Sequence, residues 1–182
     1  DGYHTAIGQG RLLRSPTVFE DAFKVLCTTN TTWRQTRAMV TRTVRALGAP
    51  LPDNCDRVAF PTPAAMLRAG EQFFKQEARL GYRAPAALAL AEQADELEAL
   101  RDVDIPTSEL RRRLLTLKGI GPYGAATLLM LLGRYDYLAV DRGVLSFTAK
   151  KYFEGRTGTA AEIHTLYAGW GRWKYLAHWL DP

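Results

Sequence analysis

Residues 106–144, PTSELRRRLLTLKGIGPYGAATLLMLLGRYDYLAVDRGV, decide how the rest of the chain is interpreted. Residues 109–117 have the apolar spacing of a helix, with Thr107 or Ser108 as the expected N-cap. The turn GIGP follows, in which two glycines permit a tight bend and the proline suits the first position of a new helix. An apolar run over residues 123–132 continues from this turn. The pattern predicts a helix-hairpin-helix.

The same glycines also fit a second motif. Gly119, Gly121 and Gly124 match G-x-G-x-x-G, the signature of a dinucleotide-binding turn. That signature has meaning only after a buried strand, whereas the preceding LRRRLLTLK has three consecutive arginines, no β-branched run and a helical spacing. We therefore prefer the hairpin. Its turn amides and the start of the second helix would present N–H donors to an anion such as a nucleic-acid phosphate.

Asp141 stands between an apolar run and the next helical stretch, roughly residues 142–152. Aspartate is favoured at helix starts because its carboxylate accepts N–H bonds and meets the positive end of the helix dipole. Capping alone therefore explains it. The same interactions favour the ionised form, and a charged carboxylate can stabilise a cation or activate water. The sequence therefore allows two interpretations of Asp141, as a helix cap only or as a catalytic group.

Composition is that of a globular domain with a basic balance. The 182 residues are 47% hydrophobic, with a net charge of +5 and a sequence pI near 9.4, which permits binding to a polyanion. Cys27 and Cys55 form no metal-ligand pattern, so we expect no metal site and no iron-sulfur cluster. Neither a signal peptide nor a long apolar span is present, from which we expect an intracellular protein, cytoplasmic or nucleoid-associated if bacterial.

Helix-start signals recur along the chain with short connections. The capping-box spacing occurs three times, at Thr17 with Glu20, Thr32 with Gln35, and Thr159 with Glu162. Further helices are expected from Thr62, over residues 71–78 and over residues 85–100, with a loop at residues 49–61. No segment alternates apolar and polar residues as a half-buried strand would. The sequence therefore predicts an all-α fold.

Two other segments have both a plain and a functional interpretation. In LGYRA, Tyr82 stands beside Arg83 in a turn, where it could simply be a surface tyrosine. Residues 167–181 contain three of the four tryptophans, and such aromatic density indicates either closure of the core or a wall for a nucleobase.

Taken together, these motifs resemble a known family. LKGIGPY followed by VD is similar to the hairpin and downstream aspartate of the HhH-GPD base-excision DNA glycosylases, and the resemblance covers nearly the whole chain. FPTP and LGYRA occur in the order seen in 8-oxoguanine DNA glycosylases and 3-methyladenine DNA glycosylase II. The resemblance implies a two-lobed helical HhH-GPD fold. It also implies that residues 1–182 form a single glycosylase domain without the relatives' N-terminal β-rich domain; the chain starts without methionine and so resembles a piece of a longer protein.

The resemblance also implies roles for individual residues. Gly119, Ile120, Gly121 and Tyr123 would grip DNA, and Asp141 would be catalytic. Tyr82 would wedge into the strand opposite the lesion, Arg83 would contact the orphaned base, and Asn30 would fill the gap left by the flipped nucleotide. Tyr123 stands where bifunctional members carry a lysine nucleophile, whereas Lys118 lies in the turn and does not match that position. This departure favours an enzyme without lyase activity.

The function expected on this resemblance is excision of a damaged purine, oxidised or alkylated, from double-stranded DNA by a monomer. No cofactor is required, although a monovalent cation could bridge hairpin carbonyls and a phosphate, as in relatives. The alternative is a non-catalytic DNA-binding or damage-sensing module, which would need only the hairpin and the arginines. The choice between an oxidised and an alkylated base stays open at this point.

Overall fold

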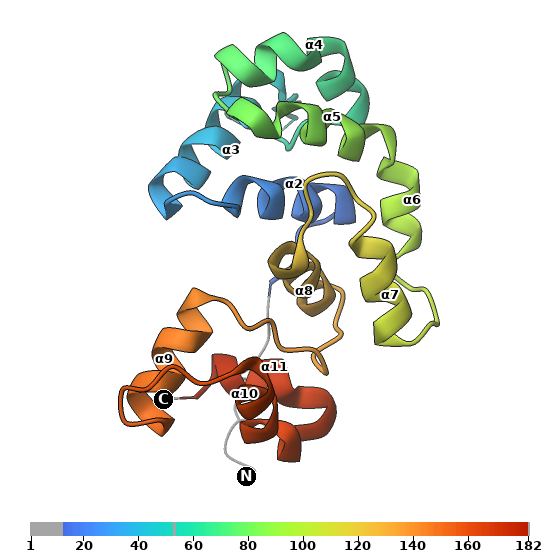
Figure 1. The fold of residues 1–182 in the computed structure, drawn as a ribbon. Helices are drawn as coiled ribbons and strands as arrows, with labels where there is room; N and C mark the ends of the chain where they lie inside the picture. The colour runs from blue at the N-terminus through green and yellow to red at the C-terminus, as the bar shows by residue number, and fades with distance from the viewer. Residues whose placement is uncertain (1–12, 53, 182) are drawn as a thin grey trace. The chain divides into compact units, whose positions relative to one another are not determined.

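The computed structural model describes residues 13–52 and 54–181, and most of these are helical (Figure 1). The chain divides into two compact units. The N-terminal unit consists of Ser15–Asp104 and Arg113–Ile120. Among the described residues, the C-terminal unit contains 105–112 and 121–181, together with 13 and 14. The prediction of an all-α fold is confirmed.

The N-terminal unit is built on α2, whose apolar face is buried as its spacing predicts. Phe23 and Leu26 of this helix are almost fully buried, and Phe23 packs against Phe74 with ring centroids 6.3 Å apart. The helices of the unit are α2 (Val18–Thr28), α3 (Trp33–Leu47), α4 (Pro63–Gln76), the 3₁₀ helix η1 (Gly81–Arg83), α5 (Ala84–Glu92) and α6 (Ala94–Ala99).

The capping predictions are confirmed in most details. Thr32 and Gln35 form a complete box, as do Thr159 and Glu162. Thr17 accepts the Glu20 N–H at 3.1 Å, but the Glu20 carboxylate pairs with Lys24, so this box is only half formed.

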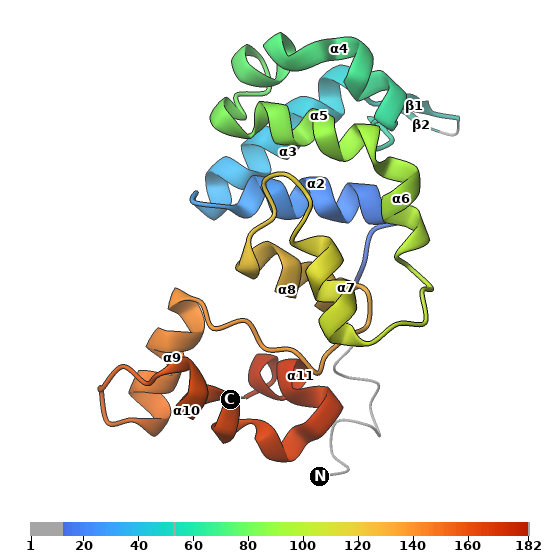
Figure 2. The ribbon, with the colours of Figure 1, turned by 45° about the vertical axis from the view of Figure 1, so that its right-hand side comes forward.

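Several element boundaries differ from the predictions. The expected loop at residues 49–61 contains a small antiparallel pair, β1 (Pro50–Leu51) and β2 (Asn54–Val58), too short for alternation to be visible (Figure 2). The expected helix over residues 85–100 breaks at Gln93, where ψ rises to 18°. The two helices expected after Thr62 are both present within α4, where non-helical backbone at Gly70, with φ of 72°, separates them.

The C-terminal unit contains the second half of the hairpin motif and a small aromatic core. Its buried cluster consists of Leu138, Val144, Ile163 and Tyr167. Its helices are α8 (Pro122–Leu131), α9 (Arg142–Tyr152), α10 (Ala160–Leu166), the 3₁₀ segment η2 (Ala168–Trp173) and α11 (Lys174–Trp179). The helix α7 (Thr107–Leu114) begins in this unit, and its last two residues belong to the N-terminal unit. Thr107 is thus the first residue of α7 and not its cap. No helix in the described part of the chain combines the length and apolar character needed to cross a membrane.

Candidate functional site

The predicted hairpin lies between α7 and α8, and Gly119 is the residue that its shape requires. Gly119 has φ of 82°, a conformation that side chains rarely adopt. A Cβ built there would lie only 2.7 Å from both Ala86 Cβ and Leu26 Cδ1. The next residue, Ile120, is 4% exposed and donates its N–H to the Leu117 carbonyl at 3.1 Å. The hairpin tip is therefore packed onto α2 and α5, and Ile120 is buried in it.

Gly121 has a different part in the hairpin. It is the exposed N-cap of α8, and a Cβ there would meet nothing within 4 Å. No side chain caps α8, and Pro122 occupies the first turn, so the helix begins without a side-chain acceptor for its amides. A helix start of this kind can take an anion, which agrees with the predicted phosphate contact.

Asp141 is the N-cap of α9. Its Oδ1 accepts the Val144 N–H at 2.8 Å. A Cβ at Gly143 would stand 3.2 Å from the same oxygen, so glycine leaves room beside the carboxylate. Within the described part of the chain, Oδ2 accepts no hydrogen bond. Asp141 is thus a cap through one oxygen and presents the other for a second interaction.

Two tyrosines accompany this carboxylate in the C-terminal unit. Tyr123, in the first turn of α8, is 41% exposed. Tyr175 of α11 is half-buried, and its pKa is raised to about 12 by burial first and then by the charges of Tyr123, when that phenol is ionised, and of Asp141. The Tyr175 ring stacks on Trp179, with centroids 6.5 Å apart and planes 18° from parallel. Sequence reasoning did not single out Tyr175, although it allowed that the C-terminal aromatics could wall a nucleobase.

A second carboxylate organises the packing of α11 against α9. Asp181 accepts hydrogen bonds from the Tyr152 hydroxyl at 2.6 Å and the Tyr167 hydroxyl at 2.8 Å. His178 Nδ1 lies 3.2 Å from the Tyr167 hydroxyl. Burial lowers the pKa of His178, while the charges of Asp181 and Asp141 act in the opposite direction. Asp181 therefore holds the aromatic segment that brings Tyr175 and His178 toward Asp141.

The N-terminal unit brings Asn30 and Tyr82 together. Asn30 has φ of 44°, in the left-handed region that asparagine tolerates. Its Nδ2 lies 3.4 Å from the hydroxyl of Tyr82, which is 67% exposed. The Asn30 hydrogen bond holds the pKa of Tyr82 below its usual value, with smaller effects from Thr29 and Arg83. An exposed ring thus lies beside an asparagine, and the wedge and gap-filling roles of the two residues stay predictions.

Arg83 is placed differently from what a base-contacting side chain would need. It is 7% exposed, and its Nε donates to the Thr29 hydroxyl at 3.2 Å. Its Nη2 donates to the carbonyl oxygens of Thr29 and Asn30. The guanidinium also lies 4.5 Å from the centre of the Tyr82 ring. In this structure Arg83 supports the loop that carries Asn30, and its contact with an orphaned base stays a prediction.

Among the described residues, no group of three or more His, Cys, Asp or Glu side chains lies close enough together to hold a metal ion. The buried Cys27 has its pKa raised to about 12 by desolvation, with the Arg83 charge acting against this, which makes the thiol a poor nucleophile and ligand.

Comparison with known proteins shows which fold this is. No protein-family model and no curated protein matches the chain. Among solved structures, the 3-methyladenine DNA-glycosylase from Archaeoglobus fulgidus matches with a TM-score of 0.74 at 24% identity, over 94% of this chain and 61% of that one. The Clostridium acetobutylicum 8-oxoguanine glycosylase/lyase in complex with double-stranded DNA matches with a TM-score of 0.76 at 19% identity, over the same shares of the two chains.

A DNA-3-methyladenine glycosidase from Bacillus halodurans also matches, with a TM-score of 0.70 at 18% identity, over 92% of this chain and 75% of that one. The chain therefore has the all-α fold of the HhH-GPD DNA glycosylases. It spans 61% of the length of the Archaeoglobus and Clostridium proteins.

Proposed function

We propose that this chain is the helical part of a monofunctional DNA glycosylase, which takes a damaged purine out of duplex DNA and hydrolyses its N-glycosidic bond. The observation that carries the proposal is the arrangement of Asp141. One oxygen is fixed by the Val144 amide, and the carboxylate lies near the half-buried Tyr175. The structures that share the fold are named as 3-methyladenine and 8-oxoguanine glycosylases, which supports the same class of activity.

In this mechanism the Asp141 carboxylate stabilises the positive charge that develops on the sugar. The bond between C1′ and the base nitrogen breaks, and its electron pair leaves with the base. Water then adds to C1′ and releases a proton. Because the Val144 amide already orients the carboxylate before substrate arrives, little reorganisation is needed at the moment of reaction. The flipped nucleotide must be out of the base stack for this geometry to form.

The aromatic rings of the C-terminal unit favour an alkylated purine over an oxidised one. Tyr123 and Trp179 are partly exposed, and the Tyr175 ring stacks on Trp179. Electron-rich ring faces attract a cationic base more strongly than a neutral one. Many alkylated purines carry a positive charge, whereas 8-oxoguanine does not. Tyr123 also supplies no amine for a Schiff base, which supports hydrolysis without strand cleavage.

Binding to duplex DNA would use the hairpin main chain at Gly119, Ile120 and Gly121. Main-chain carbonyls of the hairpin would hold a monovalent cation, and a Cβ at Gly121 would meet no atom within 4 Å, so the backbone there is open. When bound, the cation would supply positive charge to the phosphate. We propose that the protein acts as a monomer on genomic DNA inside the cell.

The test is Asp141→Asn, because capping and catalysis respond differently to it. Asparagine caps a helix about as well as aspartate, so the free energy of unfolding should change by well under roughly 1 kcal/mol. Excision should fall by about a hundredfold or more, since the charge that meets the sugar cation is gone. Unfolding, affinity for a lesion duplex and single-turnover excision would be measured on one preparation.

Asp136→Asn is the matched control, because Asp136 is an exposed carboxylate of the same unit whose contact with the Thr107 hydroxyl asparagine can retain. It should leave excision unchanged. If folded Asp141→Asn excises bases as fast as the parent, Asp141 is only a cap. A non-catalytic DNA-binding or damage-sensing module would then be the better account.

A further inference from the structure

The outward face of α3 has a composition that the proposed excision reaction does not use. Four of the fifteen residues of this helix are arginines, and none is acidic. The opposite face is buried through Thr36, Met39 and Thr43. Positions 34, 37 and 41 repeat at helical spacing, so their side chains share one outer surface.

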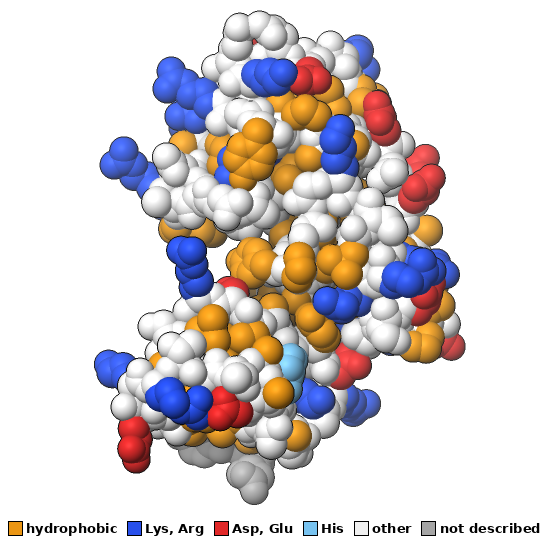
Figure 3. Space-filling view, in the orientation of Figure 1, with side chains coloured by type: hydrophobic (Ala, Val, Ile, Leu, Met, Phe, Trp, Pro, Cys, Tyr) orange, Lys and Arg blue, Asp and Glu red, His pale blue; other side chains and the backbone are white. Residues whose placement is uncertain are grey.

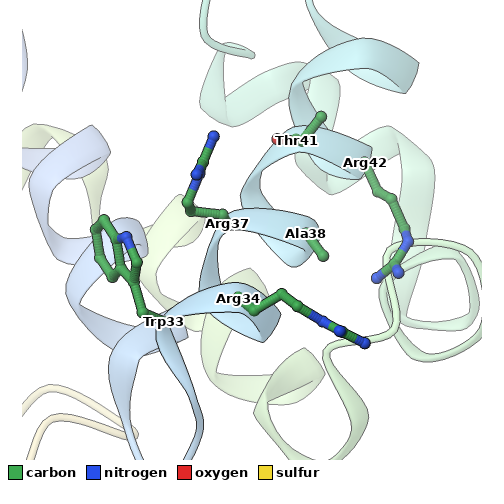
Figure 4. Close-up of a pocket in the computed structure, with 6 residues that line it drawn as sticks. All are labelled: Trp33, Arg34, Arg37, Ala38, Thr41 and Arg42. Atoms are coloured by element: carbon green, nitrogen blue, oxygen red, sulfur yellow. The ribbon is translucent and has the colours of Figure 1, made fainter.

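This surface is hollowed as well as charged. A shallow depression of about 440 Å³ is lined by Trp33, Arg34, Arg37, Ala38, Thr41 and Arg42 (Figure 4). Lys and Arg side chains also project from the edge of the molecule where α3 lies (Figure 3). The depression is open, so it suits an extended ligand that lies along the helix better than a small molecule that must be enclosed.

The arginines of α3 are not neutralised within the part of the chain that the structure describes. None of the ion pairs there involves an arginine of this helix. Arg42 makes one long contact, 3.5 Å from its Nη1 to the Ala78 carbonyl, and Arg34 and Arg37 are exposed. Uncompensated guanidinium groups in a row are the arrangement that binds successive phosphates.

Trp33 indicates which polyanion fits. Its side chain is 71% exposed at the first position of α3, next to the arginine row. A flat ring beside a basic track is the combination by which proteins bind single-stranded nucleic acid, because bases stack on the ring while arginines follow the backbone. An acidic polypeptide would satisfy the charges but would leave the indole without a stacking partner.

We propose that the outer face of α3 binds a single-stranded segment of nucleic acid, with Arg34 and Arg37 on phosphates and one base stacked on Trp33. This site is separate in its residues from the hairpin and from Asp141. It would let the protein hold an unpaired strand in addition to the duplex that the hairpin engages.

Binding of a fluorescent oligothymidylate of about twelve nucleotides, within the ~4–16 nucleotides that one such face covers, tests the proposal. Trp33→Leu should weaken binding by roughly fivefold to a hundredfold, and Trp33→Phe should retain most of it, because stacking needs a ring. Arg34→Gln with Arg37→Gln should lower the slope of log affinity against log salt by about 0.7 for each arginine. Arg68→Gln, at an exposed arginine of α4, is the matched control and should change nothing.

Two further measurements distinguish binding at this face from binding at the hairpin and from charge attraction alone. Gly121→Ala, which alters the hairpin, should leave oligothymidylate affinity unchanged, and polyglutamate should compete poorly. The proposal is overturned if Trp33→Leu binds like the parent, if Gly121→Ala weakens oligothymidylate as much as the arginine changes do, or if polyglutamate competes as well as the oligonucleotide. These readouts do not require glycosylase activity, so they stand even if Asp141 proves to be only a cap.

Discussion

The side-chain amide of Asn30 lies 3.4 Å from the hydroxyl of Tyr82, although 52 residues separate the two in sequence. This contact couples the asparagine predicted to fill the gap to the tyrosine predicted to open the stack. Because the amide donates to the phenol oxygen, it favours the ionised phenol and lowers the pKa of Tyr82. Asn30→Ala should therefore move that pKa back toward its usual value. Ultraviolet difference titration, with Tyr82→Phe to assign the signal, measures the shift.

The same pair predicts a pattern in DNA binding. Tyr82→Ala should weaken binding to lesion duplex more than binding to single strands, because its proposed work is to open the stack. Tyr82→Phe keeps the ring and should retain most of the affinity. Equal losses on both substrates would count against a wedge, and a plain surface tyrosine would show no loss in either assay.

Arg83 is expected to act through the loop that carries Asn30. Arg83→Ala removes the guanidinium that binds the partly buried carbonyl of Thr29, and the loss of hydrogen bonds made by a charged group should lower the free energy of unfolding by about 1.5 to 3 kcal/mol. Excision should fall by the same factor whichever base stands opposite the lesion. Denaturant unfolding and an opposite-base panel check this. A loss confined to one opposite base would instead show that Arg83 leaves the loop and reads that base.

The sequence predicts a site well when the interactions that form it join residues close together in the chain, and poorly when they join distant residues. The hairpin and the Asp141 cap follow from neighbouring residues, since glycine, proline and capping aspartate act within one turn. The burial of Arg83 does not, because its acceptors at Thr29 lie 54 residues away and the packing of α5 against α2 brings them near. Tyr175 was missed for the same reason. The approach of Tyr175 to Asp141 depends on the hydrogen bonds that Asp181 accepts from Tyr152 and Tyr167. The spacing of residues in the sequence does not predict these bonds.

The two hairpin glycines should respond in opposite ways to alanine. Gly119→Ala combines a left-handed conformation, which costs roughly 1–2 kcal/mol, with overlap against Ala86, so it should destabilise the fold by about 2 kcal/mol or more. Gly121→Ala meets no neighbour and should fold normally, yet its methyl group would stand where a phosphate approaches. Duplex affinity should therefore fall without loss of stability. Urea unfolding and duplex titration on both variants separate the effects, and unchanged affinity in Gly121→Ala would remove the hairpin as the anchor.

His178 reports on the charge of Asp141. Burial lowers its pKa from 6.5, and the Asp141 carboxylate opposes that shift. Removing this charge in Asp141→Asn should lower the pKa of His178 further, which proton NMR titration of the imidazole can follow, with Asp136→Asn as the unaffected control. The folded chain binds this proton less readily than the unfolded chain does. The contribution of His178 to stability is therefore fully present at a pH above 6.5, the ordinary pKa of histidine, and it declines as the pH falls below 6.5. An unchanged His178 titration in Asp141→Asn would mean that the two side chains do not interact.

The last prediction concerns strand cleavage. A lyase step requires an amine that attacks C1′ and forms a Schiff base, which borohydride reduces to a stable adduct. Tyr123 cannot provide that amine, so no covalent adduct should form when borohydride is added during turnover, and product strands should break only after alkali treatment. Lys118 is the exposed lysine of the turn and is the first residue to test. Tyr123→Lys is the positive control, because it restores an amine at the position where bifunctional members carry one. Efficient trapping by the parent, abolished by Lys118→Gln, would show that the hairpin carries its nucleophile in the turn and that the enzyme is bifunctional.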